Sequence, residues 1–162
     1  NLSRSDRKII SGGPDSFYYN SFTISSLFCI EDNSTMPRHI LIIDDMADAR
    51  LLLRLILTGK GGCAVLEAAS GAEALGQIGS QRPDAVILDY MMPDMDGLEV
   101  CRRIRAMPGL EAVPILMLTA RPDPPLREKA LAAGVSSFMT KPVNPAELLA
   151  ELDRLTEMTA GV

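Results

Sequence analysis

One stretch decides the fold: Asp84-Ala85-Val86-Ile87-Leu88-Asp89-Tyr90-Met91-Met92-Pro93-Asp94-Met95-Asp96-Gly97. Residues 85–88 form a short, continuous apolar run, which predicts a buried strand that ends at the carboxylate of Asp89. Pro93 and Gly97 then predict a loop before the next helix. In open α/β sheets the ligand crevice lies beyond the carboxyl ends of the strands, so Asp89 stands where chemistry usually occurs. A single Asp there is more often a turn former or a helix cap, so the rest of the chain must decide its role.

The composition indicates one ordinary globular domain with additional residues. The chain has 162 residues, of which 47% are apolar, and a net charge of −5, which argues against a broad nucleic-acid-binding face. No apolar run approaches the roughly 20 residues that cross a bilayer, and Gly12-Gly13-Pro14 interrupts the stretch where an export signal would continue. The cysteines (Cys29, Cys63 and Cys101) lack metal-ligand spacing and are odd in number, which fits free thiols in a cytoplasmic protein.

Residues 1–35 differ in composition from the rest of the chain. Eight of these 35 residues are Ser, and five of the seven aromatic residues of the chain lie among them. Met36-Pro37-Arg38 then leads directly into an apolar strand. Our hypothesis is therefore that residues 1–35 are an upstream leader, that Met36 is the natural start, and that residues 36–162 form the domain. The alternative is a genuine flexible tail whose aromatic side chains pack on the domain or on a second copy.

From residue 38 onward, apolar strand candidates alternate with helix candidates. Strands are expected over residues 39–43, 63–68, 85–89, 114–118 and 136–139, and helices over residues 48–58, 71–78, 96–107, 126–133 and 145–158. In the first helix, Leu51, Leu52, Leu55 and Ile56 recur at helical spacing, with Arg50 and Arg54 on another face. Five strands that alternate with five helices predict a doubly wound α/β fold, with a parallel sheet covered by helices on both faces.

Several helix starts carry recognisable caps. Ser70 followed by Glu73 three residues later has the spacing of a capping box. Asn144 precedes Pro145, and proline is favoured at the first position of a helix. These signals fix where the second and the last helix begin.

Polar side chains follow four of the five predicted strands: Asp44-Asp45, Asp89, Thr119 and, shortly after the fifth strand, Lys141. In a parallel sheet these ends open on the same edge, so the fold would gather them. Two carboxylates about 4 Å apart repel by roughly 4 kcal/mol at an effective dielectric constant near 20. A divalent cation removes this conflict, and a set of oxygen ligands suits Mg²⁺. One carboxylate could then attack phosphorus, while Lys141 supplies positive charge and Thr119 a hydrogen-bond donor.

These residues together resemble the receiver domain of two-component response regulators, which has a CheY-like fold. The resemblance covers about residues 38–158 and rests on four motifs: Asp44-Asp45, the stretch from Asp89 to Gly97, Thr119-Ala120, and Phe138-Met139-Thr140-Lys141-Pro142. It implies the strand order 2-1-3-4-5. It also implies a signalling module rather than a metabolic enzyme, limited to transfer of a phosphoryl group to itself and its later hydrolysis.

The resemblance assigns a role to each residue at the strand ends. It implies that Asp89 accepts a phosphoryl group from a histidine-kinase phosphohistidine. It implies that Mg²⁺ is bound directly by Asp45, largely through water by Asp44, and also by Asp89 and the backbone carbonyl of Met91. Lys141 would contact the phosphoryl group, and its peptide bond to the following proline would be cis.

The resemblance also implies a switch between two surfaces. Thr119 and Phe138 would be the switch pair, with the hydroxyl turning toward the phosphoryl oxygens while the ring moves inward. Met91 and Arg121 occupy the positions that gate water and so tune the lifetime of the phosphate. The segment after Thr119 departs from the family because it carries three prolines, Pro122, Pro124 and Pro125, which would stiffen the part that shifts on activation.

The expected partners are a sensor histidine kinase or a phosphotransfer protein, and then a downstream protein or a second copy. The second set would bind the surface formed by the fourth helix, fifth strand and fifth helix, with no direct contact to nucleic acid or membrane. Two alternatives remain: a pseudo-receiver that binds partners without phosphorylation, and an aspartyl-phosphate phosphatase. The phosphatase is disfavoured because enzymes similar to the haloacid dehalogenases need a second acid two residues after the nucleophile, where this chain has Met91.

Overall fold

The structure is a computed structural model that describes residues 37–120 and 123–160. Its elements are β1 (His39–Ile43), α1 (Ala47–Gly59), β2 (Ala64–Ala68), α2 (Gly71–Gln81), β3 (Ala85–Asp89), α3 (Gly97–Arg105), β4 (Ile115–Thr119), α4 (Pro124–Ala133), β5 (Ser137–Thr140) and α5 (Pro145–Ala160). All ten predicted elements are therefore present, with boundaries that differ by a few residues. The leader hypothesis for residues 1–35, the thiol of Cys29 and the role of Arg121 concern residues outside these ranges and remain predictions.

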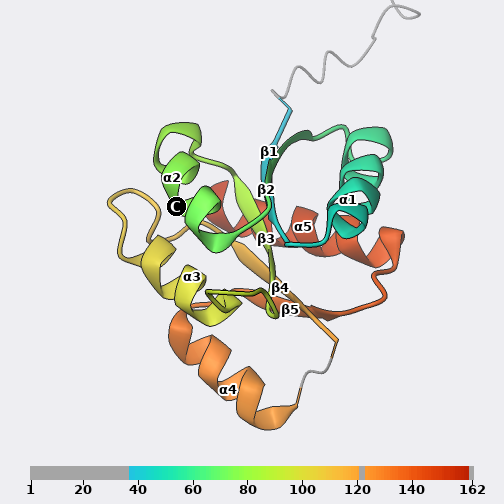
Figure 1. The fold of residues 1–162 in the computed structure, drawn as a ribbon. Coiled ribbons are helices and arrows are strands. Elements are labelled where there is room, and N and C mark those ends of the chain that lie inside the picture. The colour runs from blue at the N-terminus through green and yellow to red at the C-terminus, as the bar shows by residue number, and fades with distance from the viewer. Residues whose placement is uncertain (1–36, 121–122, 161–162) are drawn as a thin grey trace, which may run out of the picture. The chain divides into compact units, whose positions relative to one another are not determined.

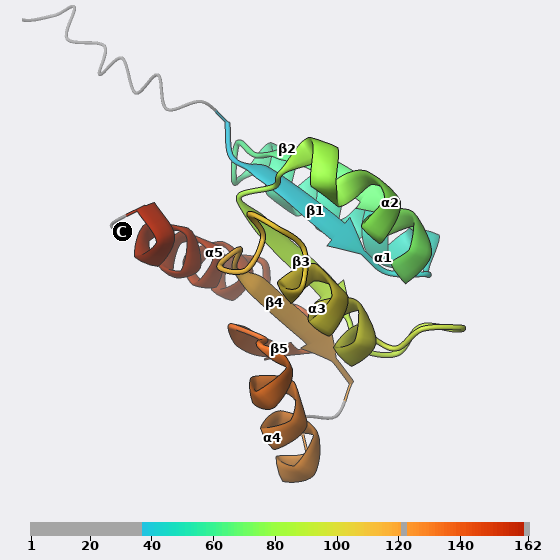
Figure 2. The same ribbon diagram turned by 90° about the vertical axis from the view of Figure 1, so that its left-hand side faces the viewer.

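The five strands form one parallel sheet in the order β2-β1-β3-β4-β5, which confirms the predicted doubly wound fold. Helices α1 and α5 cover one face, and α2, α3 and α4 cover the other (Figure 1). Because side chains alternate along a strand, each central strand supplies both cores. Ile40 and Ile42 of β1 pack toward α1 and α5, whereas Leu41 and Ile43 belong to the core on the opposite face. Figure 2 shows the same layers from the side.

The buried face of α1 differs from the one that the leucine spacing suggested. Leu53, Ile56 and Leu57 are buried against the sheet, whereas Leu51, Leu52 and Leu55 are exposed. The helix carries six apolar side chains between residues 51 and 57, so more than one apolar stripe can be drawn on it. Only one stripe can face the sheet, and the other leaves an apolar patch in solvent.

The predicted caps are present at the helix starts. The Ser70 hydroxyl accepts a hydrogen bond from the Glu73 amide at 3.1 Å, and the Glu73 carboxylate accepts one from the amide of Ala69 at 2.7 Å. The side-chain oxygen of Asn144 accepts hydrogen bonds from the amides of the residues two and three positions later, at 2.9 and 3.3 Å. These bonds satisfy amides that have no partner within the helix.

The amino-terminal edge of the sheet joins the two ends of the described domain. Arg38, just before β1, lies 2.6 Å from the carboxylate of Asp153 and donates a hydrogen bond to the Thr156 hydroxyl at 3.0 Å. Both partners lie on α5, so the last helix is attached beside the first strand.

The thiols of Cys63 and Cys101 are buried and form no disulfide. None of the helices in the described part of the chain combines the length and the apolar character that crossing a bilayer requires.

Candidate functional site

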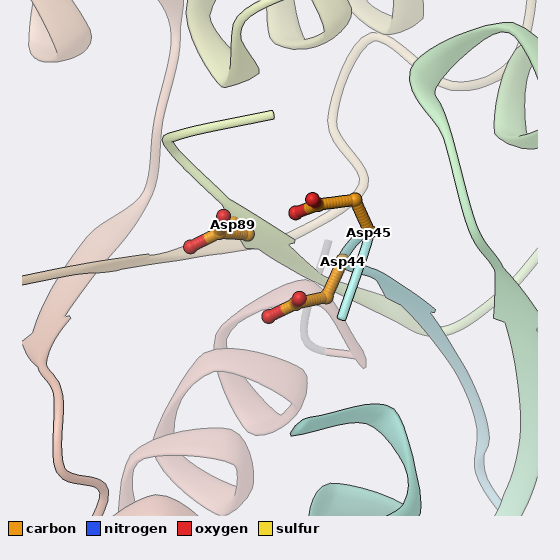
Figure 3. A group of neighbouring side chains, drawn as sticks. All are labelled: Asp44, Asp45 and Asp89. Atoms are coloured by element: carbon orange, nitrogen blue, oxygen red, sulfur yellow. The ribbon is translucent and has the colours of Figure 1, made fainter. Parts of the chain in front are cut away.

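Three carboxylates meet at the carboxyl edge of the sheet, as predicted (Figure 3). Asp44 and Asp45 follow β1, and Asp89 is the last residue of β3, which pairs directly with β1. One oxygen from each carboxylate lies within 4.8 Å of the others. Asp44 and Asp89 are only 1% and 6% exposed, whereas Asp45 is open to solvent. Two of the three acids are therefore held in the protein, and one stands at its surface.

Lys141 is the cation of the cluster. It follows β5 and extends across the edge, so that its Nζ lies 2.8 Å from Asp44 Oδ2 and 2.8 Å from Asp89 Oδ1. The peptide bond from Lys141 to Pro142 is cis, as the resemblance implied. One ammonium group thus bridges two buried carboxylates that come from different strands.

The burial and the charges of the cluster act on both partners. Burial raises the pKa of Asp89, and the neighbouring charges of Asp44 and Asp45 raise it further, although Lys141 opposes them. Burial by itself would lower the pKa of Lys141, but its hydrogen bonds to Asp44 and Asp89 outweigh this effect and the pKa is raised. Lys141 is therefore a stable cation at neutral pH, and Asp89 carries an unfavourable negative charge that an added cation would relieve.

Three hydrogen bonds that involve the backbone shape the loops that carry the acids. The amide of Met46 donates to Asp44 Oδ1 at 2.9 Å, and Arg50 Nη1 donates to the carbonyl oxygen of Asp44 at 2.7 Å. On the other loop, the Gly97 amide donates to the carbonyl oxygen of Tyr90 at 3.0 Å. A Cβ at Gly97 would lie 2.5 Å from the carbonyl oxygen of Asp89, so only glycine allows this close return of the chain. The contact of Arg50 with this loop was not predicted, because its spacing places Arg50 on a separate helix face from the leucines.

The predicted switch residues lie on the neighbouring strands β4 and β5. Thr119 is the buried last residue of β4 and pairs in register with Thr140. Phe138 is half-buried, packs against the core beneath α4, and also lines an open hollow of about 340 Å³. The other lining residues come from α4, from β5 and the residue before it, and from α5: Arg127, Leu131, Ser136, Ser137, Thr140 and Arg154. Met91 is 70% exposed beside the acids.

The donor set fits a hard divalent cation. The three clustered ligand atoms are carboxylate oxygens, with no histidine or cysteine among them, and they lie close enough for one ion to reach all three. Mg²⁺ prefers oxygen ligands, uses few carboxylates and keeps several waters, which suits a cluster with one solvent-exposed member. The chemistry of the site therefore agrees with the cation predicted from the sequence.

Comparison with known proteins shows which family this chain is similar to. Residues 40–153 match the family model of the response regulator receiver domain. The cyclic di-GMP phosphodiesterase response regulator RpfG of Xanthomonas campestris is 38% identical over 128 residues, which are 78% of this chain and 34% of that protein. The response regulator MprA of Mycolicibacterium vanbaalenii is 45% identical over 124 residues, which are 76% of this chain and 52% of that protein. This chain thus spans between one third and about half of the length of these relatives.

Solved structures share the fold. The chemotaxis protein CheY4 of Vibrio cholerae aligns with a TM-score of 0.71 and 34% identity, covering 74% of this chain and 98% of that one. The receiver domain of the sensor histidine kinase PA1611 from Pseudomonas aeruginosa, which has a magnesium ion coordinated in its active site cleft, aligns with a TM-score of 0.69 and 32% identity, covering 75% and 98%. With its acidic edge, its strand order and the family match over residues 40–153, this chain belongs to the response regulator receiver domains of two-component systems.

Proposed function

We propose that the domain is a phosphorylation-dependent receiver in which Asp89 accepts a phosphoryl group. The donor would be the phosphohistidine of a sensor histidine kinase or of a phosphotransfer protein in the cytoplasm. One observation carries the proposal: a buried carboxylate, Asp89, shares one sheet edge with two other carboxylates and with the ammonium group of Lys141. That combination gives a nucleophile, a place for a divalent cation and a fixed positive charge around one reacting centre.

The transfer can be written from the residues at this edge. A carboxylate oxygen of Asp89 attacks the phosphorus atom, the phosphorus–nitrogen bond breaks, and its electron pair stays on the histidine nitrogen. Lys141 Nζ already lies 2.8 Å from the Asp89 carboxylate, so it is placed to contact the phosphoryl oxygens when they carry the negative charge. We propose that the Thr119 hydroxyl donates to one of these oxygens.

The same proposal assigns the metal ligands. Asp45 would bind Mg²⁺ directly, Asp44 largely through water, and Asp89 and the backbone carbonyl of Met91 would complete the protein ligands. When bound, the ion would supply charge neutralisation at the transferring oxygens. Support comes from the close oxygen cluster and from the magnesium ion in the cleft of the PA1611 receiver.

Phosphorylation would then change the surface beyond β4 and β5. The phosphoryl group adds negative charge at the acidic edge and biases an existing equilibrium between two conformations. The side chains of Thr119 and Phe138 would change position as this equilibrium shifts. Phe138 can pass the change to the surface, because it both packs on the core and lines the hollow between α4 and α5. A downstream protein or a second copy would bind this α4–β5–α5 surface, and Met91 with Arg121 would tune how long the phosphate persists.

The alternative function is a pseudo-receiver, which would have the same fold and bind partners without being phosphorylated. A phosphatase is less well supported, because the residue two positions after Asp89 is Met91, whose side chain is exposed and offers no acid. The presence of acid, lysine and threonine together at one edge favours the phosphorylated receiver.

The test is the intact mass of the protein after incubation with Mg²⁺ and acetyl phosphate. We expect a gain of one phosphoryl group that is lost in Asp89→Asn and abolished by a chelator. The matched control is Asp94→Asn, which removes the same charge from an exposed position in the same loop. No gain in the folded wild-type protein would favour the pseudo-receiver, and a gain that persists in Asp89→Asn would identify a different acceptor.

A further inference from the structure

We infer that Arg50 is a positioning residue that fixes the loop bearing Asp44 and Asp45 and thereby sets the affinity of the acidic edge for Mg²⁺. The inference rests on the proposed function only in taking this edge as a cation site. Arg50 belongs to the first turns of α1, and its side chain is 16% exposed. Such burial is uncommon for arginine unless its donors are used.

The guanidinium group of Arg50 makes the last of the polar contacts that hold Asp44 in place. The amide of Asp44 donates to the carbonyl oxygen of Ala68 at 3.2 Å, its Oδ1 accepts from the Met46 amide, and its Oδ2 contacts Lys141. The remaining polar group, the carbonyl oxygen, accepts from Arg50 Nη1 at 2.7 Å. Arg50 is thus the side chain that holds the main chain at the turn from β1 into the acidic loop.

Arg50 is itself anchored on the neighbouring strand. Its Nε lies 3.4 Å from Oε2 of Glu67 on β2, and Arg54 Nε lies 3.1 Å from Oε1 of the same carboxylate. Gln77 of α2 donates to the Glu67 carbonyl oxygen at 2.9 Å. Because the guanidinium is a planar fork, contacts to a carboxylate and a carbonyl at once leave Arg50 little freedom. The acidic loop is therefore tied through Arg50 to β2.

The need for this tie follows from the charges. Three carboxylates have oxygens within 4.8 Å of one another, and Lys141 contacts only Asp44 and Asp89. Asp45 is therefore repelled by the other two without a cationic partner of its own in the cluster, and it can move away into solvent. A loop that opens must be closed again when the cation binds, and the cost of closing lowers the affinity. By holding the Asp44 carbonyl, Arg50 keeps the ligands together beforehand.

The direction in which the Mg²⁺ affinity changes when Arg50 is removed distinguishes positioning of the loop from a purely electrostatic effect. Arg50 carries a positive charge near the site but donates to a carbonyl oxygen and not to the ligand oxygens. If it acted only through its charge, its removal would make the edge more negative and strengthen Mg²⁺ binding. If it positions the loop, its removal weakens binding. The two explanations predict opposite changes.

The experiment is calorimetric titration of the full chain with Mg²⁺ at fixed ionic strength, using Arg50→Met, Arg50→Lys and the matched control Arg54→Met. Arg54 also pairs with Glu67, but none of its hydrogen bonds or ion pairs among the described residues reaches the acidic loop. Loss of a residue that orients metal ligands typically costs 10- to 100-fold in affinity, so we expect Arg50→Met to raise Kd by about tenfold. Arg54→Met should stay within about twofold of wild type, because the charge lost is the same but the loop contact is kept. Arg50→Lys should recover part of the loss, because an ammonium group can donate to one of the two acceptors.

An unchanged or lower Kd in Arg50→Met, or an equal loss in Arg54→Met, overturns the inference, as does a wild-type protein that binds no Mg²⁺. Thermal unfolding with chelator present identifies a variant that fails to fold. Should Arg50→Met fail, Arg50→Lys keeps the charge but can reach only one of the two acceptors, so it must still weaken binding if Arg50 positions the loop. Wild-type protein that binds Mg²⁺ but gains no mass with acetyl phosphate would refute the proposed function alone and leave the role of Arg50 intact.

Discussion

Replacing the buried acceptor by its neutral amide, Asp89→Asn, should stabilise the fold when no divalent cation is present. The Asp89 carboxylate is 6% exposed and lies among two like charges, so the folded state pays for keeping it ionised. Asparagine has nearly the same shape and can still accept a hydrogen bond from Lys141. The substitution therefore removes an electrostatic penalty and keeps the packing.

The size of the gain follows from the distances. At an effective dielectric constant of about 20, a carboxylate at 4.8 Å, the outer limit of the separations in the cluster, would repel Asp89 by about 3.5 kcal/mol, and there are two such neighbours. The ammonium group of Lys141 at 2.8 Å attracts it by about 6 kcal/mol on the same scale, which leaves a net repulsion of about 1 kcal/mol. Burial adds to this penalty, so we expect the free energy of unfolding to rise by about 1–2 kcal/mol.

The assay is urea unfolding of wild type and Asp89→Asn at pH 7 in chelator, at lower pH, and with Mg²⁺. Because the folded-state pKa of Asp89 is raised, its penalty is fully present above that pKa and disappears as the pH falls toward the ordinary carboxyl pKa of about 3.9. The advantage of the variant should therefore be greatest at pH 7 and vanish in acid. Mg²⁺ should reduce it too, because the wild-type carboxylate then gains a partner.

An Asp89→Asn variant that is less stable than wild type at pH 7 in chelator, or whose advantage persists unchanged at low pH, would refute the electrostatic penalty at Asp89. Asp94→Asn is again the control, since it removes a charge from the exposed loop and Asn tolerates the positive φ of 68° at that position. A similar gain in both variants would mean that overall charge, and not the cluster, is responsible.

Three further predictions follow from the packing and the site. Leu53→Ala should cost about 2–5 kcal/mol of stability because Leu53 is buried, whereas Leu52→Gln should change it by less than about 0.5 kcal/mol because Leu52 is exposed; urea unfolding compares them. Gly97→Ala should cost about 1–3 kcal/mol, since the new Cβ would lie 2.5 Å from the Asp89 carbonyl oxygen, and thermal unfolding would show it. Lys141→Met should slow phosphorylation by acetyl phosphate about 100-fold, measured by intact mass over time, because the charge beside the acceptor is lost; an unchanged rate would remove Lys141 from the proposed chemistry.

The acidic edge could be predicted from the sequence because each of its residues ends a strand or lies just after one. Once the predicted strands 39–43, 85–89 and 114–118 are taken as neighbouring parallel strands, Asp44, Asp89 and Thr119 must meet at one edge, whatever their separation along the chain. The turn signals and caps marked where each element starts. Local rules therefore sufficed for the elements and for the edge at which their polar residues gather, whereas the strand order followed from the resemblance to receiver domains.

Other features depend on contacts that no local rule contains. The leucines of α1 allow two apolar stripes, and only the angle at which the helix packs on the sheet decides that Leu53 is buried and Leu52 is not. The contact of Arg50 with the Asp44 carbonyl depends on Glu67, which lies on another strand and 17 positions further on. Asp44 is buried and Asp45 is exposed because the two side chains face different sides of the loop, and no local rule predicts which side is covered.

The attachment of α5 beside β1 has a consequence for how such a domain can be joined to others. Arg38 binds Asp153 and Thr156 at the amino-terminal edge of the sheet, so the start of the first strand and the later turns of the last helix are neighbours. Asp89 lies at the carboxyl edge, on the opposite side. A segment that enters the domain at Arg38 would thus approach it at the edge opposite the acceptor. A neighbour joined at that edge would leave the acidic edge accessible to a phosphoryl donor.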